Sequence, residues 1–205
     1  MLLPTRGKYL CKPLSRDRKL ASGLWLADKI KSEKTDTVCR CIGVGEPTIK
    51  ECYLCHDLPM CKKRKCKSKG KTLPIIAKRT DILHFKRAFG VRIRYENEPY
   101  ILLKNQDIVA IEDDSGRISA PGSLVIVRLQ YATHAGMIEI PDSAKMYNGD
   151  YWGEVISVGP EYPDRSLGVG DKIAYMRNEG YRFKGFKDRQ EYFSIKEKWI
   201  GGKLC

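Results

Sequence analysis

The chain has 205 residues, enough for one large domain or two small ones. Apolar residues make up 42% and charged residues 31%, and no apolar run approaches the roughly 20 residues needed to cross a bilayer, which argues against a membrane-spanning helix. The net charge of +13, from 38 basic and 25 acidic residues, favours polyanionic partners.

The first predicted element is a strand in KYLCKPL, residues 8–14. The opening stretch MLLPTRGKYLCKP has its charges after a very short apolar run, an order that a secretory signal does not have. We therefore expect a reducing, cytoplasmic setting. For a phage-encoded protein this would be the host cytoplasm or the virion.

Two stretches of the chain share one pattern. GLWLADKIKSEKTDTVCRCIGVG (23–45) and GMIEIPDSAKMYNGDYWGEVISVG (136–159) each begin with Gly and an apolar cluster, cross a polar stretch and end in a strand that closes on Val-Gly. Further along, TDILHF (80–85) matches GDKIAY (170–175), and a turn and two strands follow in each half. The repeated order of elements indicates an internal duplication.

The two halves differ in one spacing. Gly45 and Asp81 are 36 residues apart, whereas the matching Gly159 and Asp171 are 12 residues apart. The extra 24 residues predict an insertion, at about 46–79, into one loop of the first half. The underlying fold therefore does not need this segment.

The insertion carries four cysteines with the spacing C-x2-C-x5-C-x4-C. Both thiolates of the first pair can reach one ion, and the second pair can complete a tetrahedron around zinc. Structural zinc would also supply stability that so short a segment cannot obtain from a core. The predicted zinc ligands are Cys52, Cys55, Cys61 and Cys66.

Other interpretations of the cysteines stay open. In an oxidising setting, including a released virus particle, they would form disulfides instead of binding zinc. Cys39 and Cys41 stand two apart on a predicted strand and face the same side, so they are either core thiols or substitutes for a later ligand. Cys11, on the opening strand, is predicted to be a core residue.

A basic run begins directly after Cys61 and includes Cys66. No acidic residue interrupts residues 62–79, and such a run attracts polyanions by counterion release unless it serves only as a solvated loop. The candidate basic patch consists of Lys62, Lys63, Arg64, Lys65, Lys67, Lys69 and Lys71.

Short β-branched runs separated by Gly, Pro, Asn and Asp, with almost no helical periodicity, predict an all-β fold of small barrels or sandwiches. The stretch EDDSGRISAPGS is acidic and then rich in Gly, Ser and Pro, as a boundary would be. We expect a first domain at 1–114, a linker at 115–122 and a second domain at 123–205.

The order of these elements resembles the co-chaperonin (GroES-like) family. The matching stretches in the first half are KYLCKPL, SGLWL, IGVG, TDILHF and YILLKNQDIVAIED, and the second half repeats their order. The resemblance implies two tandem small β-barrels of the GroES type, the first with the cysteine-rich, zinc-binding insertion. It also implies a non-enzymatic homo-oligomer.

In that family a mobile polar loop carries an apolar tripeptide that docks into a groove on each chaperonin subunit. By resemblance, the docking residues of the first half are Leu24, Trp25 and Leu26. Each exposed apolar side chain on such an arm can contribute about 1.5–3 kcal/mol on burial, part of which is lost to ordering the loop. The alternative is that these residues form a core strand.

The matching segment of the second half departs from the apolar pattern at Glu139, and burying an unpaired carboxylate is costly. The remaining candidate docking residues there are Met137, Ile138 and Ile140.

Two other functions remain open. Tandem barrels with a cross-linked loop and positive charge would suit a phage virion structural protein, either a capsid decoration or a neck component. Zinc and basic residues would suit a nucleic-acid-binding module. An enzyme is not expected: medium-chain dehydrogenases use a similar barrel with a four-cysteine zinc lobe, but this chain contains no G-x-G-x-x-G motif.

Overall fold

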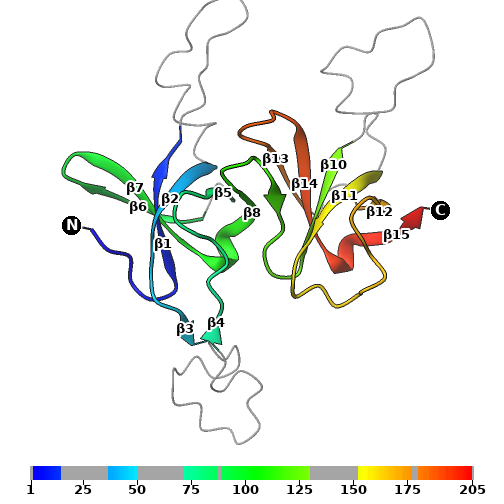
Figure 1. Cartoon of the computed structure of the whole chain (residues 1–205), viewed down its shortest axis with the longest axis horizontal. Helices are drawn as coiled ribbons and strands as arrows, with labels where there is room; N and C mark the ends of the chain where they lie inside the picture. The colour runs from blue at the N-terminus through cyan, green and yellow to red at the C-terminus, as the bar shows by residue number, and fades with distance from the viewer. Residues whose placement is uncertain are drawn as a thin grey trace, which may run out of the picture. The chain divides into compact units, whose positions relative to one another are not determined.

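The structure is a computed structural model, and it describes residues 2–14, 37–49, 72–86, 89–129, 152–176 and 180–204. Contacts between residues divide the chain into two compact units, Met1–Ile108 and Val109–Cys205. These are called the first unit and the second unit below (Figure 1).

The first unit is built around an antiparallel sheet in the order β6-β7-β1-β2-β5. A separate two-stranded ladder joins β3 to β4. Its elements are β1 (Lys8–Pro13), β2 (Val38–Val44), β3 (Thr48–Ile49), β4 (Thr72–Leu73), β5 (Ile82–Phe85), β6 (Val91–Tyr95), β7 (Glu98–Lys104) and the 3-10 turn η1 (Asn105–Asp107).

The second unit contains a six-stranded sheet in the order β13-β14-β10-β11-β12-β15, and β8 pairs with β9. Strand β8 begins at Ile108, the last residue of the first unit, and continues into the second. The elements are β8 (Ile108–Glu112), β9 (Ile118–Ser119), β10 (Leu124–Leu129), β11 (Trp152–Val158), β12 (Lys172–Tyr175), β13 (Gly180–Lys184), β14 (Glu191–Lys196), the 3-10 turn η2 (Glu197–Trp199) and β15 (Ile200–Leu204).

The predicted all-β class is confirmed for the part of the chain that the structure describes, where the only helices are the single turns η1 and η2. None of the described helices is long and apolar enough to span a membrane. The closed barrels stay a prediction. The contacts divide the chain after Ile108, and Ile118 and Ala120 of the expected linker at 115–122 pack into a buried cluster of the second unit. The expected domain limits stay a prediction.

The two units have the same strand pairing. Strand β1 pairs with β2 and β7, and β10 pairs with β11 and β14. The register of each first ladder shifts once, between Leu10 and Cys11 in one unit and between Ile126 and Val127 in the other. These shifts align the two ladders residue by residue, so that Cys11 and Val127 hold equivalent positions.

The apolar run of β10 is buried on both faces. Val125 and Val127 pack into one cluster with Ile173 and Ile195. Ile126 points to the other face and packs into a second cluster with Ala110, Ile118, Ala120, Phe183 and Tyr192. Because successive side chains of a strand point to opposite faces, a strand covered on both sides needs a continuous apolar sequence.

The Val-Gly ending of β2 and β11 has a steric cause. A Cβ atom on Gly45 would lie 2.1 Å from the backbone oxygen of Thr5, and one on Gly159 would lie 2.2 Å from that of Gly122. The Gly45 N–H also donates to Lys8 O of β1 at 2.9 Å, and the Gly159 N–H donates to Leu124 O of β10 at 2.8 Å. Only glycine allows this close approach of two backbones.

Candidate functional site

All of the site residues predicted from the sequence lie outside the described residues. This holds for the docking residues Leu24, Trp25, Leu26, Met137, Ile138 and Ile140, for the zinc ligands Cys52, Cys55, Cys61 and Cys66, and for the basic patch from Lys62 to Lys71. The structure describes the strands from which these segments leave the fold.

The docking segment of the first unit joins β1 to β2. Next to the two ends of this segment, the Leu14 N–H donates to Val38 O at 3.1 Å, and the Phe85 N–H donates to Thr37 O at 3.0 Å. The chain therefore leaves for residues 15–36 and returns from them on two adjacent strands (Figure 1). The matching segment of the second unit likewise joins two paired strands, β10 and β11.

Residues 74–76, which lie near the end of the expected insertion, are held on the first unit by a chain of hydrogen bonds. The Tyr9 hydroxyl donates to Asn105 Oδ1 at 2.7 Å and accepts the Ile76 N–H at 2.9 Å. Asn105 Nδ2 in turn donates to Pro74 O at 2.9 Å. Burial raises the pKa of Tyr9, so the hydroxyl keeps its proton. Val125, which has no hydroxyl group, holds the equivalent position in the second unit, so this anchor belongs to the first unit.

The predicted zinc site is not tested by this geometry. Across the described ranges, no three or more His, Cys, Asp or Glu side chains are grouped in a way that could hold a metal ion. The cysteine set of the insertion lies outside those ranges, and zinc stays a prediction.

A surface that the sequence did not predict lies where β8 and β9 pack on the β13–β14 hairpin of the second unit. Ala110 and Ile118 share a buried cluster with Phe183 and Tyr192, whose rings stack at a centroid distance of 5.5 Å. Ser194 Oγ donates to Val109 O at 2.9 Å. This strand of the chain is therefore held by both apolar and polar contacts.

Glu112 anchors the end of the same strand. Its side chain is fully buried, and its two carboxylate oxygens accept the backbone N–H groups of Phe186 and Lys187, each at 2.8 Å. The sequence held one signal for this contact, since a carboxylate that ends the apolar run IVAIE must find a partner if the strand is buried.

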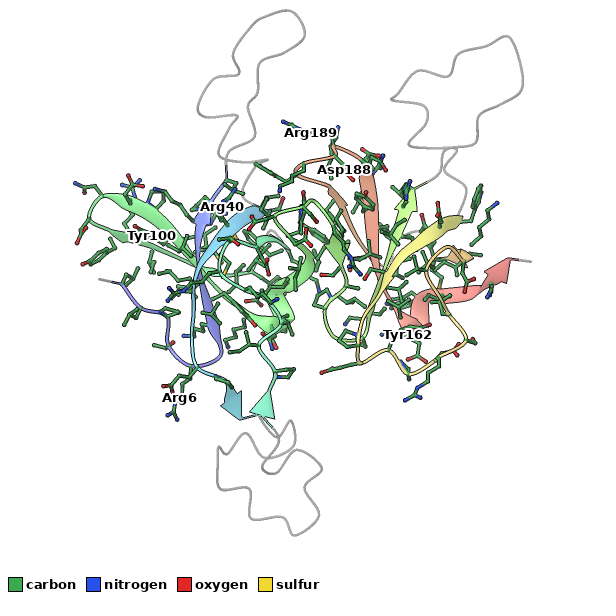
Figure 2. All side chains as sticks on the ribbon, viewed as in Figure 1. Arg6, Arg40, Tyr100, Tyr162, Asp188 and Arg189 are labelled. Atoms are coloured by element: carbon green, nitrogen blue, oxygen red, sulfur yellow. The ribbon has the colours of Figure 1, made fainter. Side chains whose placement is uncertain are left out.

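The equivalent surface of the first unit is exposed. By register, Val91 and Tyr100 of the β6–β7 hairpin match Tyr181 and Tyr192. Val91 is 59% exposed, and Ile42, which matches the partly buried Ile156, is 39% exposed. Figure 2 labels Tyr100 on this hairpin. The first unit thus shows an apolar surface of the kind that β8 and β9 cover in the second unit.

These features define a class of protein: an all-β chain of two units with the same strand pairing, in which a long segment joins the first two paired strands of each sheet. The model of the family described as Chaperonin 10 Kd subunit (Cpn10) matches residues 118–204, which is most of the second unit.

Curated relatives extend the likeness to about half of the chain. The chain is 27% identical to co-chaperonin GroES of Lactobacillus acidophilus over 112 residues, which cover 55% of this chain and 99% of that protein. It is 24% identical to co-chaperonin GroES of Cutibacterium acnes over 108 residues, 53% of this chain and 91% of the relative. For the Streptomyces griseus protein the identity is 23% over 108 residues, 53% of this chain and 86% of the relative. The chain therefore contains a GroES-like domain.

Proposed function

We propose that this chain is a non-enzymatic, co-chaperonin-like protein made of two tandem GroES-like units, which assembles into an oligomer and docks on a chaperonin-type ring. The observation that carries the proposal is the family match over residues 118–204. The strand pairing that the first unit shares with this matched region supports the extension to both units. A cytoplasmic setting is part of the same proposal.

Docking is assigned to the apolar residues of the segment between β1 and β2, Leu24, Trp25 and Leu26. Two adjacent strands hold both ends of this segment, which supports its role as an arm that leaves the fold and returns at one place. The segment between β10 and β11 carries Met137, Ile138 and Ile140 and is assigned as the weaker arm, because Glu139 interrupts its apolar pattern.

A pull-down against a chaperonin ring with ATP tests docking. We expect the wild-type chain to be retained and Trp25→Glu to lose at least about tenfold in affinity, since the change removes a large apolar contact and adds a charge. The matched control is Val169→Glu, which puts the same charge at a side chain that is already 72% exposed. Absence of retention for the wild type, or equal loss in both variants, would refute the docking proposal.

Assembly is assigned to the exposed apolar surface of the first unit and to β15. Strand β8 follows the 3-10 turn η1, and strand β15 follows the 3-10 turn η2. By this order β15 matches β8, the strand that covers the β13–β14 hairpin of the second unit. Gly201, Gly202 and Lys203 of β15 are exposed. We infer that β15 of a second copy covers the surface around Val91 and Ile42.

Light scattering on the eluting protein tests assembly. We expect an oligomer for the wild type and a smaller species for Val91→Glu, because a charge at the centre of a buried apolar contact costs several kcal/mol, roughly 2–4. The Val169→Glu variant again serves as the control. A monomeric wild type would contradict this part of the proposal.

Zinc binding by Cys52, Cys55, Cys61 and Cys66 remains an independent proposal, which zinc quantification and thiol titration of the purified protein would test. The virion and nucleic-acid functions gain no support from the described residues or from the comparisons.

A further inference from the structure

Three buried cysteines of the first unit share one face of the β1–β2 ladder. Cys11 and Cys39 are fully buried and Cys41 is 1% exposed. Cys39 and Cys41 stand two apart on β2 and so point to the same side, and the register pairs Cys11 with Cys41 directly across the ladder. The Cys39 thiol donates to Leu83 O at 3.8 Å, and the Cys41 thiol donates to Gly43 O at 3.6 Å.

The Cys11 and Cys41 pair belongs to the type of cross-strand pair that has no hydrogen bonds between its own backbones. The Cys41 N–H donates to Asp81 O, and Cys41 O accepts the Thr80 N–H, both at 2.8 Å, so both groups point away from Cys11. In an antiparallel ladder such pairs have Cα atoms about 4.5 Å apart, and disulfides join Cα atoms about 4.4–6.8 Å apart. The pair therefore belongs to a type whose usual spacing suits a disulfide.

The second unit shows that this position does not require cysteine for packing. Val127 and Val155 occupy the positions of Cys11 and Cys41, and Gly153 occupies that of Cys39. A Cβ atom on Gly153 would lie 3.2 Å from the Cβ of Val127. Valine is bulkier than the cysteine at the matching position, and the second unit has glycine where the first has the side chain of Cys39. The same ladder is thus filled in one unit by aliphatic groups and in the other by three thiols.

We propose that Cys11 and Cys41 form a reversible disulfide. The bond would link β1 and β2 close to the ends of the segment that joins these two strands. The bond would enclose residues 12–40 in one covalent ring and would join the strand that enters this segment to the strand that leaves it. The proposal concerns the first unit alone and does not depend on docking or assembly.

The chemistry needs a peroxide as the oxidant. One thiol, as the thiolate, attacks the peroxide oxygen, which breaks the O–O bond and yields a sulfenic acid and an alcohol or water. The second thiol then attacks the sulfenic sulfur, which forms the S–S bond and releases water. In sum, two thiols and one peroxide give one disulfide, one alcohol or water and one further water.

The surroundings set the rate of this reaction. A hydrogen bond with Cys39, together with burial, raises the pKa of Cys11. A hydrogen bond with Cys11 and burial raise the pKa of Cys41. Both groups are therefore thiols at neutral pH, and oxidation is expected to be slower than that of free cysteine and to accelerate as the pH rises.

Peptide mapping of the intact, full-length chain tests the proposal. The reduced protein is treated with hydrogen peroxide, its remaining thiols are alkylated, and it is digested without reduction for mass spectrometry. We expect a cross-linked peptide that joins Cys11 to Cys41, about 2 Da lighter than the two reduced peptides together and separated by dithiothreitol. Circular dichroism before and after treatment shows whether the cross-link forms in the folded protein.

Two variants sharpen the assignment. Cys41→Val introduces the residue that the second unit carries at this position, so it should fold and form no cross-link at Cys11. Cys39→Ala should keep the Cys11–Cys41 cross-link. A folded wild type whose Cys11 stays unlinked after exhaustive oxidation, or links mainly to Cys39 or to another cysteine of the chain, would overturn the proposal, and so would a cross-link seen only after the protein unfolds.

Discussion

Replacing Glu112 by alanine gives the most direct test of how β8 is held on the second unit. The carboxylate is fully buried and accepts two backbone N–H groups, those of Phe186 and Lys187, each at 2.8 Å. Hydrogen bonds to a charged group contribute about 1.5–3 kcal/mol each. Two effects reduce the sum: the variant no longer buries a charge, and water can reach the exposed Lys187 amide. We therefore expect a net loss of about 2–3 kcal/mol in the free energy of unfolding.

Urea unfolding followed by tryptophan fluorescence measures this loss in the correct unit. The chain has three tryptophans, of which Trp152 and Trp199 lie in the second unit. In a Trp25→Phe background the emission therefore reports on the second unit alone.

The control for Glu112→Ala is Glu161→Ala, which removes an exposed carboxylate from the same unit. This control should change the free energy of unfolding by less than about 0.5 kcal/mol. Glu112→Gln, which keeps one acceptor oxygen, should fall between the two. A loss below about 1 kcal/mol for Glu112→Ala, or a loss equal to that of the control, would show that the two backbone contacts do not hold the strand.

Three further outcomes follow from single contacts. Gly159→Ala places a Cβ atom 2.2 Å from a backbone oxygen and should lower the free energy of unfolding of the second unit by at least about 2 kcal/mol in the same urea assay. Tyr9→Phe removes two hydrogen bonds without changing the volume, so the Ile76 amide should exchange with deuterium faster by NMR while the fold is kept. A hydrogen bond from Lys203 lowers the pKa of Asp171, so the stability that this carboxylate gives is present above its unfolded pKa and is lost as the pH falls through its folded pKa. Asp171→Asn should therefore show less acid destabilisation below about pH 4 in thermal scans, and an unchanged acid dependence would contradict the contact.

The sequence was sufficient to predict the all-β class of the fold. The strand pairing that the two units share agrees with the repeated order of elements, and the tandem GroES-like copies stay a prediction. Val-Gly endings at Gly45 and Gly159 could be recognised because a close backbone approach tolerates only glycine, and this requirement survives wherever the pairing is kept. The apolar run of β10 is consistent with its burial, since packing on both faces leaves no polar position among Val125, Ile126 and Val127.

The sequence could not predict how separate segments meet. The pairing of Cys11 with Cys41 depends on the register shift between Leu10 and Cys11, and a slip of one residue would turn the thiol to the other face. The burial of Glu112 depends on a hairpin more than 70 residues further along the chain. Such contacts follow from tertiary packing and leave only weak local signals, such as an acid at the end of an apolar strand.

Strands β1 and β2 of the first unit carry polar and thiol side chains where the second unit has aliphatic side chains and a glycine. Tyr9 stands in place of Val125 and holds the chain that returns from the insertion. Two residues further along β1, Cys11 stands in place of Val127, and on β2 Cys41 and Cys39 stand in place of Val155 and Gly153. The two ladders have the same register with the same single shift, so these exchanges are not needed to form the sheet. Since a core tolerates volume-conserving apolar exchanges most easily, the hydroxyl and thiol groups at these positions of the first unit are not explained by packing alone.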